Sequence, residues 1–364
     1  MSLGFLAAAA VRVYIGTYTG PDSKGIYTSL LDPDKGTLSE PALAATLESP
    51  SFVVLHPNGK VLYAASEVED GEAKTGFVHA FAIDAATGAL RALGRQSSEG
   101  GSPCHLTVSN AGTHVLVANY GGTVASLPIT DDGGLAPAVS VIRHEGSSVN
   151  PERQKGPHAH SINLDPAGRF AFAADLGLDK ILAYAFDDKG KLSALTSAHV
   201  SVPPGSGPRH FTFHPSGRYA YLNNEMFSNV TAFRYDAEKG RLEELQTLST
   251  LPADFTGKNN STAEVQCSPD GRFVYVSNRG HDSIAIFSVD EKTGKLTAAG
   301  HVPTGGRKPR NFRIDPSGRW LLAANQDSGD VVVFAIDGAT GGLKPAGSRI
   351  AVGHPVCVKF APVR

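Results

Sequence analysis

The chain of 364 residues is longer than one ordinary compact domain, so it holds either several domains or one large repeat architecture. Its formal net charge of −2, with both signs mixed along the chain, excludes the basic surface that nucleic acids and anionic membranes require and favours a small-molecule partner. Forty Gly and 23 Pro, with only 19% charged residues, indicate many turns that join short buried strands.

Residues 1–10 form an apolar, Ala-rich segment before the first predicted strand. We interpret this segment as a tag or the remainder of a signal peptide, and residues 11–364 as a single domain. A complete signal peptide has a basic region before its apolar part, and this segment has none. No apolar run in the sequence is long enough to span a membrane. We therefore expect a cytoplasmic protein without membrane contact, with export as the alternative if the Ala-rich segment is a signal remnant.

A Gly-x-Leu turn recurs at a mean interval of about 51 residues, near the repeat length of kelch-like propellers. In five of the copies an Asp four residues earlier is placed to cap the turn with its side chain. The seven copies begin at Gly36, Gly88, Gly133, Gly190, Gly240, Gly294 and Gly341.

Each repeat also contains a hairpin turn between apolar strands, such as Leu55–Gly59 or Phe213–Gly217, so that one unit has the four strands of a propeller blade. Six units are complete, and the seventh is divided between Val11–Ile15 near one end and His354–Phe360 near the other. The sequence therefore predicts an all-β, seven-bladed β-propeller of four-stranded antiparallel blades. Its N- and C-terminal strands share one blade, which removes an open sheet edge.

Two framework positions change their side chain from blade to blade, and such positions are where a repeat protein can hold a site. The first follows the residue that opens each innermost strand and is assigned to Ser51, Cys104, His158, Arg209, Glu264 and Arg310. The second follows the Asn or Ser that ends the next strand and is assigned to Glu67, Tyr120, Glu225, Arg279 and Gln326. Because these strands are antiparallel, both positions meet at one mouth of the central channel. We expect arginines, carboxylates and imidazoles to cluster there, the imidazoles being those of His105, His158, His160 and His210.

Structural roles compete with functional ones at several of these positions. The strand-ending Asn recurs in register, which favours a turn or blade-pairing role for Asn119, Asn224, Asn278 and Asn325. Because buried charges need partners, a salt-bridge ring around the channel is the structural alternative for Arg209, Glu225, Glu264 and Arg279. Four other histidines are assigned to the surface, namely His114, His144, His281 and His301.

The cysteines and histidines do not have the spacing of a metal site. The three cysteines lie far apart with no CxxC pair, and the His158-Ala-His160 pair lacks further ligands at suitable spacing. We therefore predict neither a disulfide framework nor a bound metal.

Five segments, in their order and spacing, resemble the seven-bladed β-propeller lactonases: Tyr14–Thr19, Asn150–His160, Gly207–His214, Asn223–Glu225, and Ala263–Glu264 leading to Ser277–Arg279. That family contains 6-phosphogluconolactonases and is similar to the fungal carboxymuconate-lactonizing enzymes, and the resemblance extends from about Val13 to Phe360. It implies hydrolysis of 6-phosphoglucono-δ-lactone to 6-phosphogluconate, a step of the pentose phosphate route, without a cofactor. A working set of one His, two Arg and one Glu is implied, which here is His158 or His160 with Arg209, Arg279 and Glu225.

Lactone hydrolysis needs an activated water, a stabilised oxyanion and a proton for the ring oxygen. We predict that Glu225 or His160 is the base, with Glu264 as the alternative, and that Arg279 donates to the oxyanion. Arg209 is expected to hold the phosphate because its planar fork binds such groups bidentately. Further substrate contacts are expected from His105, Tyr120, His210, Asn224, Arg310 and Gln326.

Two other functions stay open at this point. One is a different lactone chemistry in the same channel, including cycloisomerisation of a muconate. The other is a non-catalytic propeller that binds ligands or proteins. The sequence does not indicate an oligomeric state.

Overall fold

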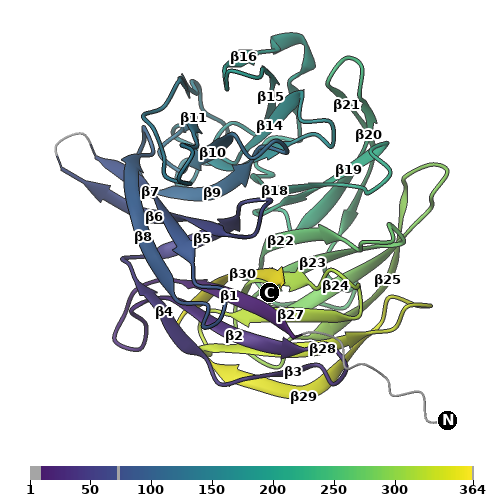
Figure 1. Ribbon diagram of the computed structural model, residues 1–364. Coiled ribbons are helices and arrows are strands. Elements are labelled where there is room, and N and C mark those ends of the chain that lie inside the picture. The colour runs from purple at the N-terminus through teal and green to yellow at the C-terminus, as the bar shows by residue number, and fades with distance from the viewer. Residues whose placement is uncertain (1–9, 72–73, 363–364) are drawn as a thin grey trace, which may run out of the picture.

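The computed structural model describes residues 10–71 and 74–362, so most of the Ala-rich segment lies outside the described residues. Seven antiparallel sheets stand around a central channel, with the innermost strands of successive sheets in contact (Figure 1). Within the described ranges the only helical element is η1, a single 3₁₀ turn at Thr196–Ala198. The prediction of an all-β, seven-bladed propeller is confirmed.

The first three blades in chain order are complete within single stretches of chain, and their strands run from the channel outward. Blade 1 contains β5 (Pro50–Leu55), β6 (Val61–Asp70), β7 (Thr75–Ile83) and β8 (Leu90–Ser97). Blade 2 contains β9 (Pro103–Val108), β10 (His114–Asn119), β11 (Thr123–Pro128) and β12 (Ser140–Arg143). Blade 3 contains β13 (Ala159–Leu164), β14 (Phe170–Asp175), β15 (Lys180–Phe186) and an interrupted edge formed by β16 (Leu192–Ala194) and β17 (Val200–Ser201).

The next three blades repeat this order. Blade 4 contains β18 (Pro208–Phe213), β19 (Tyr219–Asn224), β20 (Asn229–Asp236) and β21 (Arg241–Ser249). Blade 5 contains β22 (Ser261–Cys267), β23 (Phe273–Arg279), β24 (Ser283–Val289) and β25 (Leu296–Pro303). Blade 6 contains β26 (Pro309–Ile314), β27 (Trp320–Asn325), β28 (Asp330–Ile336) and β29 (Leu343–Ala351).

The seventh blade joins the two ends of the chain. Its innermost strand is β30 (Pro355–Pro362), which pairs with β1 (Val11–Thr17), so that the purple and yellow ends of the ribbon lie side by side in Figure 1. The blade continues outward through β2 (Gly25–Asp32) to an edge formed by β3 (Thr37–Leu38) and β4 (Ala42–Thr46). The predicted closure is confirmed, and β1 has no open edge because it is paired on both sides.

The seven Gly-x-Leu turns lock each blade to its neighbour. Each turn glycine has a positive φ, and a Cβ at Gly36 would lie only 2.2 Å from the ring of Trp320 at the start of β27. The same close approach recurs in every other blade, in the pairs Gly88–Arg12, Gly133–Val61, Gly190–His114, Gly240–Phe170, Gly294–Tyr219 and Gly341–Phe273. The repeat is therefore an inter-blade contact as well as a turn signal, and only glycine leaves room for it.

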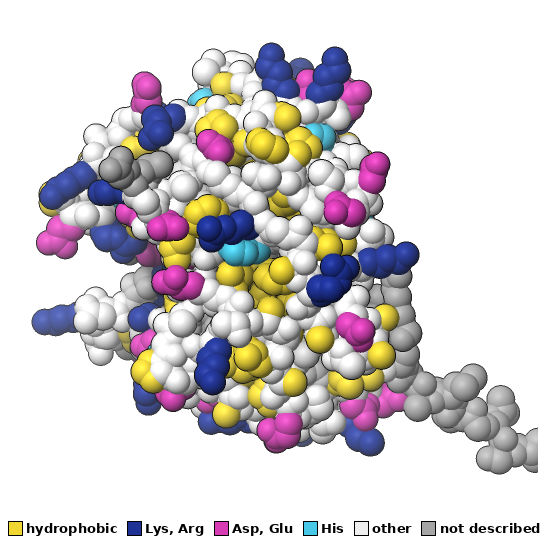
Figure 2. Space-filling model, turned by 60° about the vertical axis from the view of Figure 1, so that its left-hand side comes forward, with side chains coloured by type: hydrophobic (Ala, Val, Ile, Leu, Met, Phe, Trp, Pro, Cys, Tyr) yellow, Lys and Arg dark blue, Asp and Glu magenta, His cyan; other side chains and the backbone are white. Residues whose placement is uncertain are grey.

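Apolar side chains fill the space between blades. Phe172 of blade 3, for example, packs with Phe211 and Phe233 of blade 4 in one buried cluster. On the face shown in Figure 2, basic and acidic side chains are interspersed and do not form a field of one sign.

The innermost strands share an irregularity that shapes the channel. Near the start of each of the seven, the register with the second strand shifts by one residue. In β18, Pro208 pairs with Asn224 and Phe211 with Leu222, so the intervening residues lie in the bulge. A bulge of this kind redirects a side chain, and here it occurs at the mouth where polar residues were predicted.

The observed register corrects the position predicted for His158. Ala159 pairs with Asp175, as the strand-opening Pro pairs with the strand-ending Asn in other blades. His160 therefore follows the strand opening, and His158 lies in the loop before β13. The proline before His158 resembled the others in sequence but belongs to this loop.

The position predicted for Glu264 is also wrong by one residue. Thr262 pairs with Asn278 at the end of β23, which makes Thr262, and not Ala263, the equivalent of the strand-opening Pro. Glu264 consequently lies one residue deeper along the channel, level with His210 of the preceding blade. Glu264 thus belongs to a different layer of the site from Arg209.

Candidate active site

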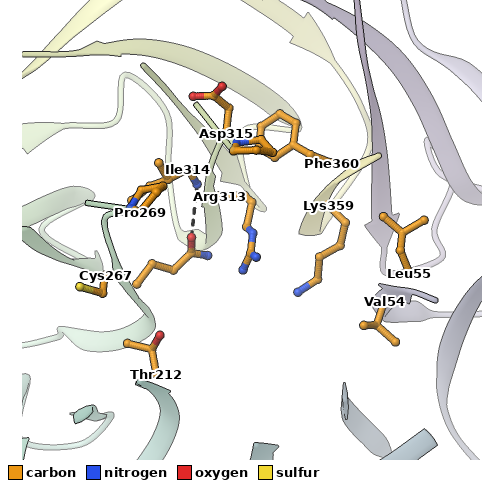
Figure 3. Close-up of a pocket in the computed structure, with 12 residues that line it drawn as sticks. Val54, Leu55, Thr212, Cys267, Pro269, Arg313, Ile314, Asp315, Lys359 and Phe360 are labelled. Atoms are coloured by element: carbon orange, nitrogen blue, oxygen red, sulfur yellow. Dashed lines mark hydrogen bonds between the residues drawn. The ribbon is translucent and has the colours of Figure 1, made fainter. Parts of the chain in front are cut away.

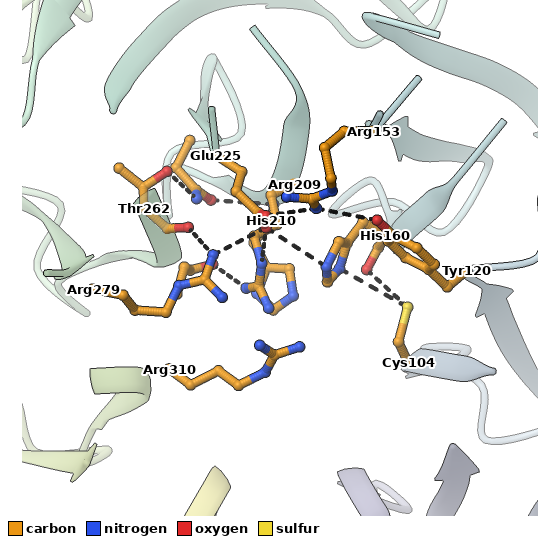
Figure 4. A network of polar contacts seen from close by, with 12 residues as sticks. Cys104, Tyr120, Arg153, His160, Arg209, His210, Glu225, Thr262, Arg279 and Arg310 are labelled. Carbon is orange, nitrogen blue, oxygen red and sulfur yellow. Dashed lines mark hydrogen bonds and ion pairs between the residues drawn. The ribbon is translucent and has the colours of Figure 1, made fainter. Parts of the chain in front are cut away.

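A buried carboxylate surrounded by arginines lies at the mouth of the channel (Figure 4). Glu225 directly follows β19 and is 5% exposed. Its Oε2 lies 3.0 Å from both Arg209 Nε and Arg279 Nη2, and its Oε1 accepts a hydrogen bond of 2.9 Å from Arg153 Nη2. Burial alone would raise the pKa of Glu225, but the three guanidiniums together hold it well below its ordinary value. Glu225 is therefore an anion at neutral pH.

The two inner arginines are fixed by backbone carbonyls as well. Arg209 donates through Nη1 to the carbonyl of Ala263, and Arg279 donates through Nη2 to the carbonyl of Thr262 at 2.8 Å. Both side chains are buried, and the Nε of Arg279 has no hydrogen-bond partner in the described part of the chain. Arg279 thus keeps one buried N–H donor without a partner among the described residues.

Arg310 has a different partner from the other arginines. Its Nη2 donates to the hydroxyl of Tyr18 at 2.9 Å, and that hydroxyl lies 3.0 Å from Glu67 Oε2. No carboxylate in residues 10–71 or 74–362 forms an ion pair with Arg310, and Figure 4 shows its guanidinium directed toward the space around Glu225. Arg310 is half-buried.

One layer deeper, five side chains close the channel. His210 Nδ1 lies 3.2 Å from Glu264 Oε2, and the same oxygen accepts a hydrogen bond from Asn311. The rings of His210 and His105 meet edge to face at 5.3 Å, and His105 packs at 4.3 Å against Phe52. All five are buried, and we call them the floor ring.

The floor ring holds two titratable groups in unusual states. Burial raises the pKa of Glu264, and the nearby cations only partly offset this effect. Burial, and then the charge of Arg209, lowers the pKa of His210 well below 6.5, so this imidazole is neutral at neutral pH. Its Nε2 is buried without a hydrogen-bond partner among the described residues. A neutral imidazole oriented at Nδ1 by a carboxylate is a suitable general base.

The two histidines of the Asn150–His160 segment lie on either side of Tyr120. His158 stacks on the Tyr120 ring at 4.2 Å, and its Nδ1 lies 2.8 Å from the Tyr120 carbonyl oxygen. His160 is buried, with its Nε2 3.9 Å from Glu225 Oε2 and its Nδ1 3.9 Å from Cys104 Sγ. Burial, followed by the charge of Arg209, lowers the pKa of His160 well below its ordinary value.

Two of the residues predicted to contact substrate lie outside this network. The amide of Asn224 donates to Asn229 and Thr231 within its own blade, at 2.6 and 3.0 Å. Asn119, Asn278 and Asn325 likewise donate within or next to their own blades, in agreement with a structural role for the whole set. For the Gln326 side chain, no hydrogen bond or ion pair joins it to the Glu225 cluster in the described residues.

The surface assignment is wrong for two histidines. His114 packs under the turn at Gly190, and His144 is 4% exposed. His144 Nδ1 lies 2.6 Å from Asp175 Oδ2, and its Nε2 lies 2.7 Å from the Tyr184 hydroxyl. His281 and His301 are half-buried, and their rings meet at 5.9 Å.

Sequence reasoning missed two residues that build this mouth and gave no role to two others. Arg153 and Asp175 were not singled out, although Arg153 lies within the Asn150–His160 segment that carries the family resemblance. Asp175 accepts the backbone N–H of His158 at 2.8 Å and so fixes that loop. Tyr18 and Glu67 were noted only as members of segments or positions, and the contact of Tyr18 with both Arg310 and Glu67 depends on blade closure.

Two negative findings concern the described residues alone. No group of three or more His, Cys, Asp or Glu side chains in residues 10–71 and 74–362 has the arrangement of a metal site. In the same ranges, no helix has the length and apolar character needed to cross a bilayer.

Comparison with known proteins decides the family. The family model described as lactonase, 7-bladed β-propeller, matches residues 12–360. The chain belongs to the seven-bladed β-propeller lactonase family. It is 42% identical over 348 residues to the 6-phosphogluconolactonase of Bacillus subtilis, covering 95% of this chain and 97% of that protein. It is 35% identical over 313 residues to the 6-phosphogluconolactonase of Formosa agariphila, covering 83% of this chain and 86% of that protein.

Among solved structures, this lactonase is similar to the periplasmic gluconolactonase of Pseudomonas aeruginosa, with a TM-score of 0.92 and 35% sequence identity. The match covers 98% of this chain and 100% of that one. The predicted family resemblance is confirmed, and the chain is a lactone hydrolase.

Proposed function

We propose that this lactonase hydrolyses 6-phosphoglucono-δ-lactone to 6-phosphogluconate at the Glu225 mouth of the channel. The observation that carries the proposal is the charge of this mouth. Among the described residues, Arg153, Arg209, Arg279 and Arg310 converge there, and the carboxylates that contact this group are those of Glu225 and Glu67. Four positive and two negative charges leave an excess of two, which matches the dianion of a phosphate monoester.

Arg310 is the group we assign to the substrate phosphate. Sequence reasoning gave this role to Arg209, but the guanidinium of Arg209 is buried and occupied by Glu225 and the Ala263 carbonyl. Among the described residues, Arg310 is bound by the neutral hydroxyl and ring of Tyr18 and by no carboxylate, so its charge is available to a ligand. Arg153, whose side chain is 44% exposed, lies on the other side of Glu225 and is the second arginine that we assign to the substrate phosphate.

Arg279 is the group we assign to the oxyanion, as the sequence suggested. Its guanidinium is held by Glu225 and the Thr262 carbonyl, while its Nε has no partner in the described residues. A donor fixed before the reaction stabilises the charge that develops on the lactone oxygen without having to reorganise. Glu225 and Arg209 then act as positioning residues that hold this donor in place.

His210 is the base that we favour, with Glu264 as its positioning partner. Both carboxylate oxygens of Glu225 are occupied by arginine N–H groups, whereas His210 is neutral and its Nε2 has no hydrogen-bond partner in the described residues. In the proposed reaction His210 takes a proton from water as the water oxygen bonds to the lactone carbonyl carbon. When the bond from that carbon to the ring oxygen breaks, the imidazolium returns the proton to the ring oxygen. No cofactor takes part in this scheme.

The cellular location of the protein has two candidates, the cytoplasm and the periplasm. One solved relative is named a periplasmic gluconolactonase, whereas the proposed substrate carries a phosphate and arises in the pentose phosphate pathway of the cytoplasm. We propose a cytoplasmic location, with export as the alternative. Fractionation of the native host cells, followed by immunodetection of the protein, distinguishes the two.

The test is an acid-release assay on freshly generated 6-phosphoglucono-δ-lactone beside glucono-δ-lactone, corrected for spontaneous hydrolysis. Wild type is compared with Glu225→Gln and with Glu243→Gln, a control at an exposed ion pair with Arg234. We expect fast hydrolysis of the phosphorylated lactone in wild type and Glu243→Gln and strong loss in Glu225→Gln. Equal rates on both lactones would move the substrate to an unphosphorylated sugar lactone, and no rate above background would overturn the proposal.

A further inference from the structure

A second polar cavity lies at the other end of the channel. It has a volume of about 430 Å³ and lies beyond the floor ring, where the innermost strands run into their hairpin turns (Figure 3). Strand side chains alternate, so residues two positions beyond the floor ring face the same channel. Four of these residues, Val54, Thr212, Gln266 and Arg313, line the cavity together with Lys359, which lies two positions beyond Cys357 in β30.

Two cations point into this lower cavity. Figure 3 shows the side chains of Arg313 and Lys359 directed into the same space. They come from β26 and β30, which lie next to each other around the channel. In the described residues neither side chain has an ion pair or a hydrogen bond, and the Lys359 ammonium lies 4.4 Å from the ring centroid of Phe52.

The nearby carboxylates are already occupied. Asp315 lines the cavity, but it accepts the backbone N–H of Trp320 at 2.7 Å and the Ser317 hydroxyl at 2.5 Å within its turn. Figure 3 shows the Asp315 carboxylate pointing away from the two cations. Glu264 belongs to the floor ring and is bonded by His210 and Asn311. Arg313 is exposed and Lys359 is half-buried. Neither lies within ion-pair distance of a carboxylate among the described residues, so both are available to an anion that enters the cavity.

Neutral donors complete the lining. The side-chain amide of Gln266 is fully bonded, because its Nε2 donates to the Phe312 carbonyl at 2.6 Å and its Oε1 accepts the Ile314 N–H at 3.2 Å. It therefore lines the cavity in a fixed orientation. The Thr212 hydroxyl, in contrast, has no hydrogen bond in the part of the chain that the structure describes and lies across the cavity from Lys359 (Figure 3). A guanidinium fork, an ammonium and a hydroxyl are the donors that a phosphate group takes.

We propose that the lower cavity is a second anion site, which binds inorganic phosphate or a small phosphate monoester and is separate from the active site. The floor ring divides the two, since Phe52, His105 and His210 pack against one another between them. The proposal does not depend on the identity of the lactone, because it rests on Arg313, Lys359 and Thr212 alone.

The experiment is calorimetric titration of the full chain with inorganic phosphate at about 0.15 M ionic strength, where weak surface attraction is screened. All variants carry Arg310→Gln, so that phosphate binding at the upper mouth does not obscure the lower site. Arg313→Gln is compared with Arg319→Gln, an arginine of the same blade whose side chain is 51% exposed and ion-paired with Asp34. Thermal unfolding confirms that each variant is folded.

We expect Arg313→Gln to weaken phosphate binding at least tenfold, since a hydrogen bond to a charged group is worth about 1.5–3 kcal/mol and tenfold is about 1.4 kcal/mol. Arg319→Gln should leave the affinity unchanged, and Thr212→Val should weaken it without any change of charge. A loss smaller than tenfold in Arg313→Gln, or an equal loss in Arg319→Gln, overturns the proposal. A parallel titration with glucose 6-phosphate distinguishes the two ligand classes. Tighter binding of glucose 6-phosphate assigns the site to phosphate monoesters, and tighter binding of inorganic phosphate assigns it to the free anion. Lactonase activity is not part of this readout, so failure of the proposed function leaves the result intact.

Discussion

Replacing Glu225 by Gln tests whether the mouth of the channel is held together by charge. The variant keeps the size of the side chain but leaves Arg153, Arg209 and Arg279 around a neutral amide. Removing one partner from a buried ion cluster costs about 3–5 kcal/mol of unfolding free energy. For a chain of this size that is a fall in Tm of about 4–7 °C. The exposed pair of Glu243 with Arg234 should contribute less than about 1 kcal/mol, so Glu243→Gln serves as the matched control.

The pH dependence of this difference gives a second, sharper readout. The pKa of Glu225 is depressed in the folded state, so its stabilisation is present in full above the ordinary value of 4.5 and is lost as pH falls through the folded-state pKa. The gap between wild type and Glu225→Gln should therefore be complete at neutral pH and shrink below pH 4.5. Urea denaturation at several pH values measures it. Equal stability of the two proteins at neutral pH, or a gap that grows on acidification, would refute the reasoning.

The other predictions concern the substrate grip, the base and the mouth loop. Arg310→Gln should raise the KM for the phosphorylated lactone by about 10- to 100-fold and spare glucono-δ-lactone, and equal losses on both in steady-state kinetics would contradict this. His210→Asn should lower kcat by about 10²–10⁴-fold, and a loss under about tenfold would remove it as the base. Because the pKa of His210 is depressed below 6.5, the pH profile of wild-type kcat/KM should be level above pH 6.5 and fall only below it, whereas an acid limb centred at a higher pH would speak against this base. Asp175→Ala should lower the unfolding free energy by about 3–5 kcal/mol, because it leaves His144 and three backbone N–H groups without their acceptor. The control Asp188→Ala, at an exposed position, should change the unfolding free energy by less than about 0.5 kcal/mol. Similar values for the two variants in urea denaturation would contradict the structural role of Asp175.

The blade count could be predicted because the repeat signal is a local contact made seven times. The turn glycine must be glycine, since the first residue of the neighbouring blade's second strand fills the space of a Cβ, as Trp320 does at Gly36. The Asp before the turn is equally local, with Asp32 Oδ1 accepting the N–H groups of Asp34 and Lys35. Such signals appear in sequence with a fixed spacing, so the architecture and its closure follow from them.

The layers of the site could not be predicted in the same way. A one-residue bulge shifts each innermost strand, and the residue that enters it is set by hydrogen-bond pairing rather than by spacing. The sequence therefore placed Glu264 beside Arg209, whereas it pairs with His210 one layer deeper. Arg153 reaches Glu225 from the loop before β13, and the path of that loop carries no periodic signal at all.

The contrast between Arg209 and Arg310 shows why residue type and repeat position together still leave function open. Both follow the Pro that opens an innermost strand, and the sequence offers no reason to separate them. Arg209 lies near Glu225 in its own blade and is ion-paired with it, whereas Arg310 lies near the end of β1, where Tyr18 offers a neutral hydroxyl. That neighbour is 292 residues away and arrives only because the first strand closes the ring beside the last blade. The closure that removes an open edge thus also leaves one arginine uncommitted at the mouth, and this is the arginine that a phosphorylated substrate would require.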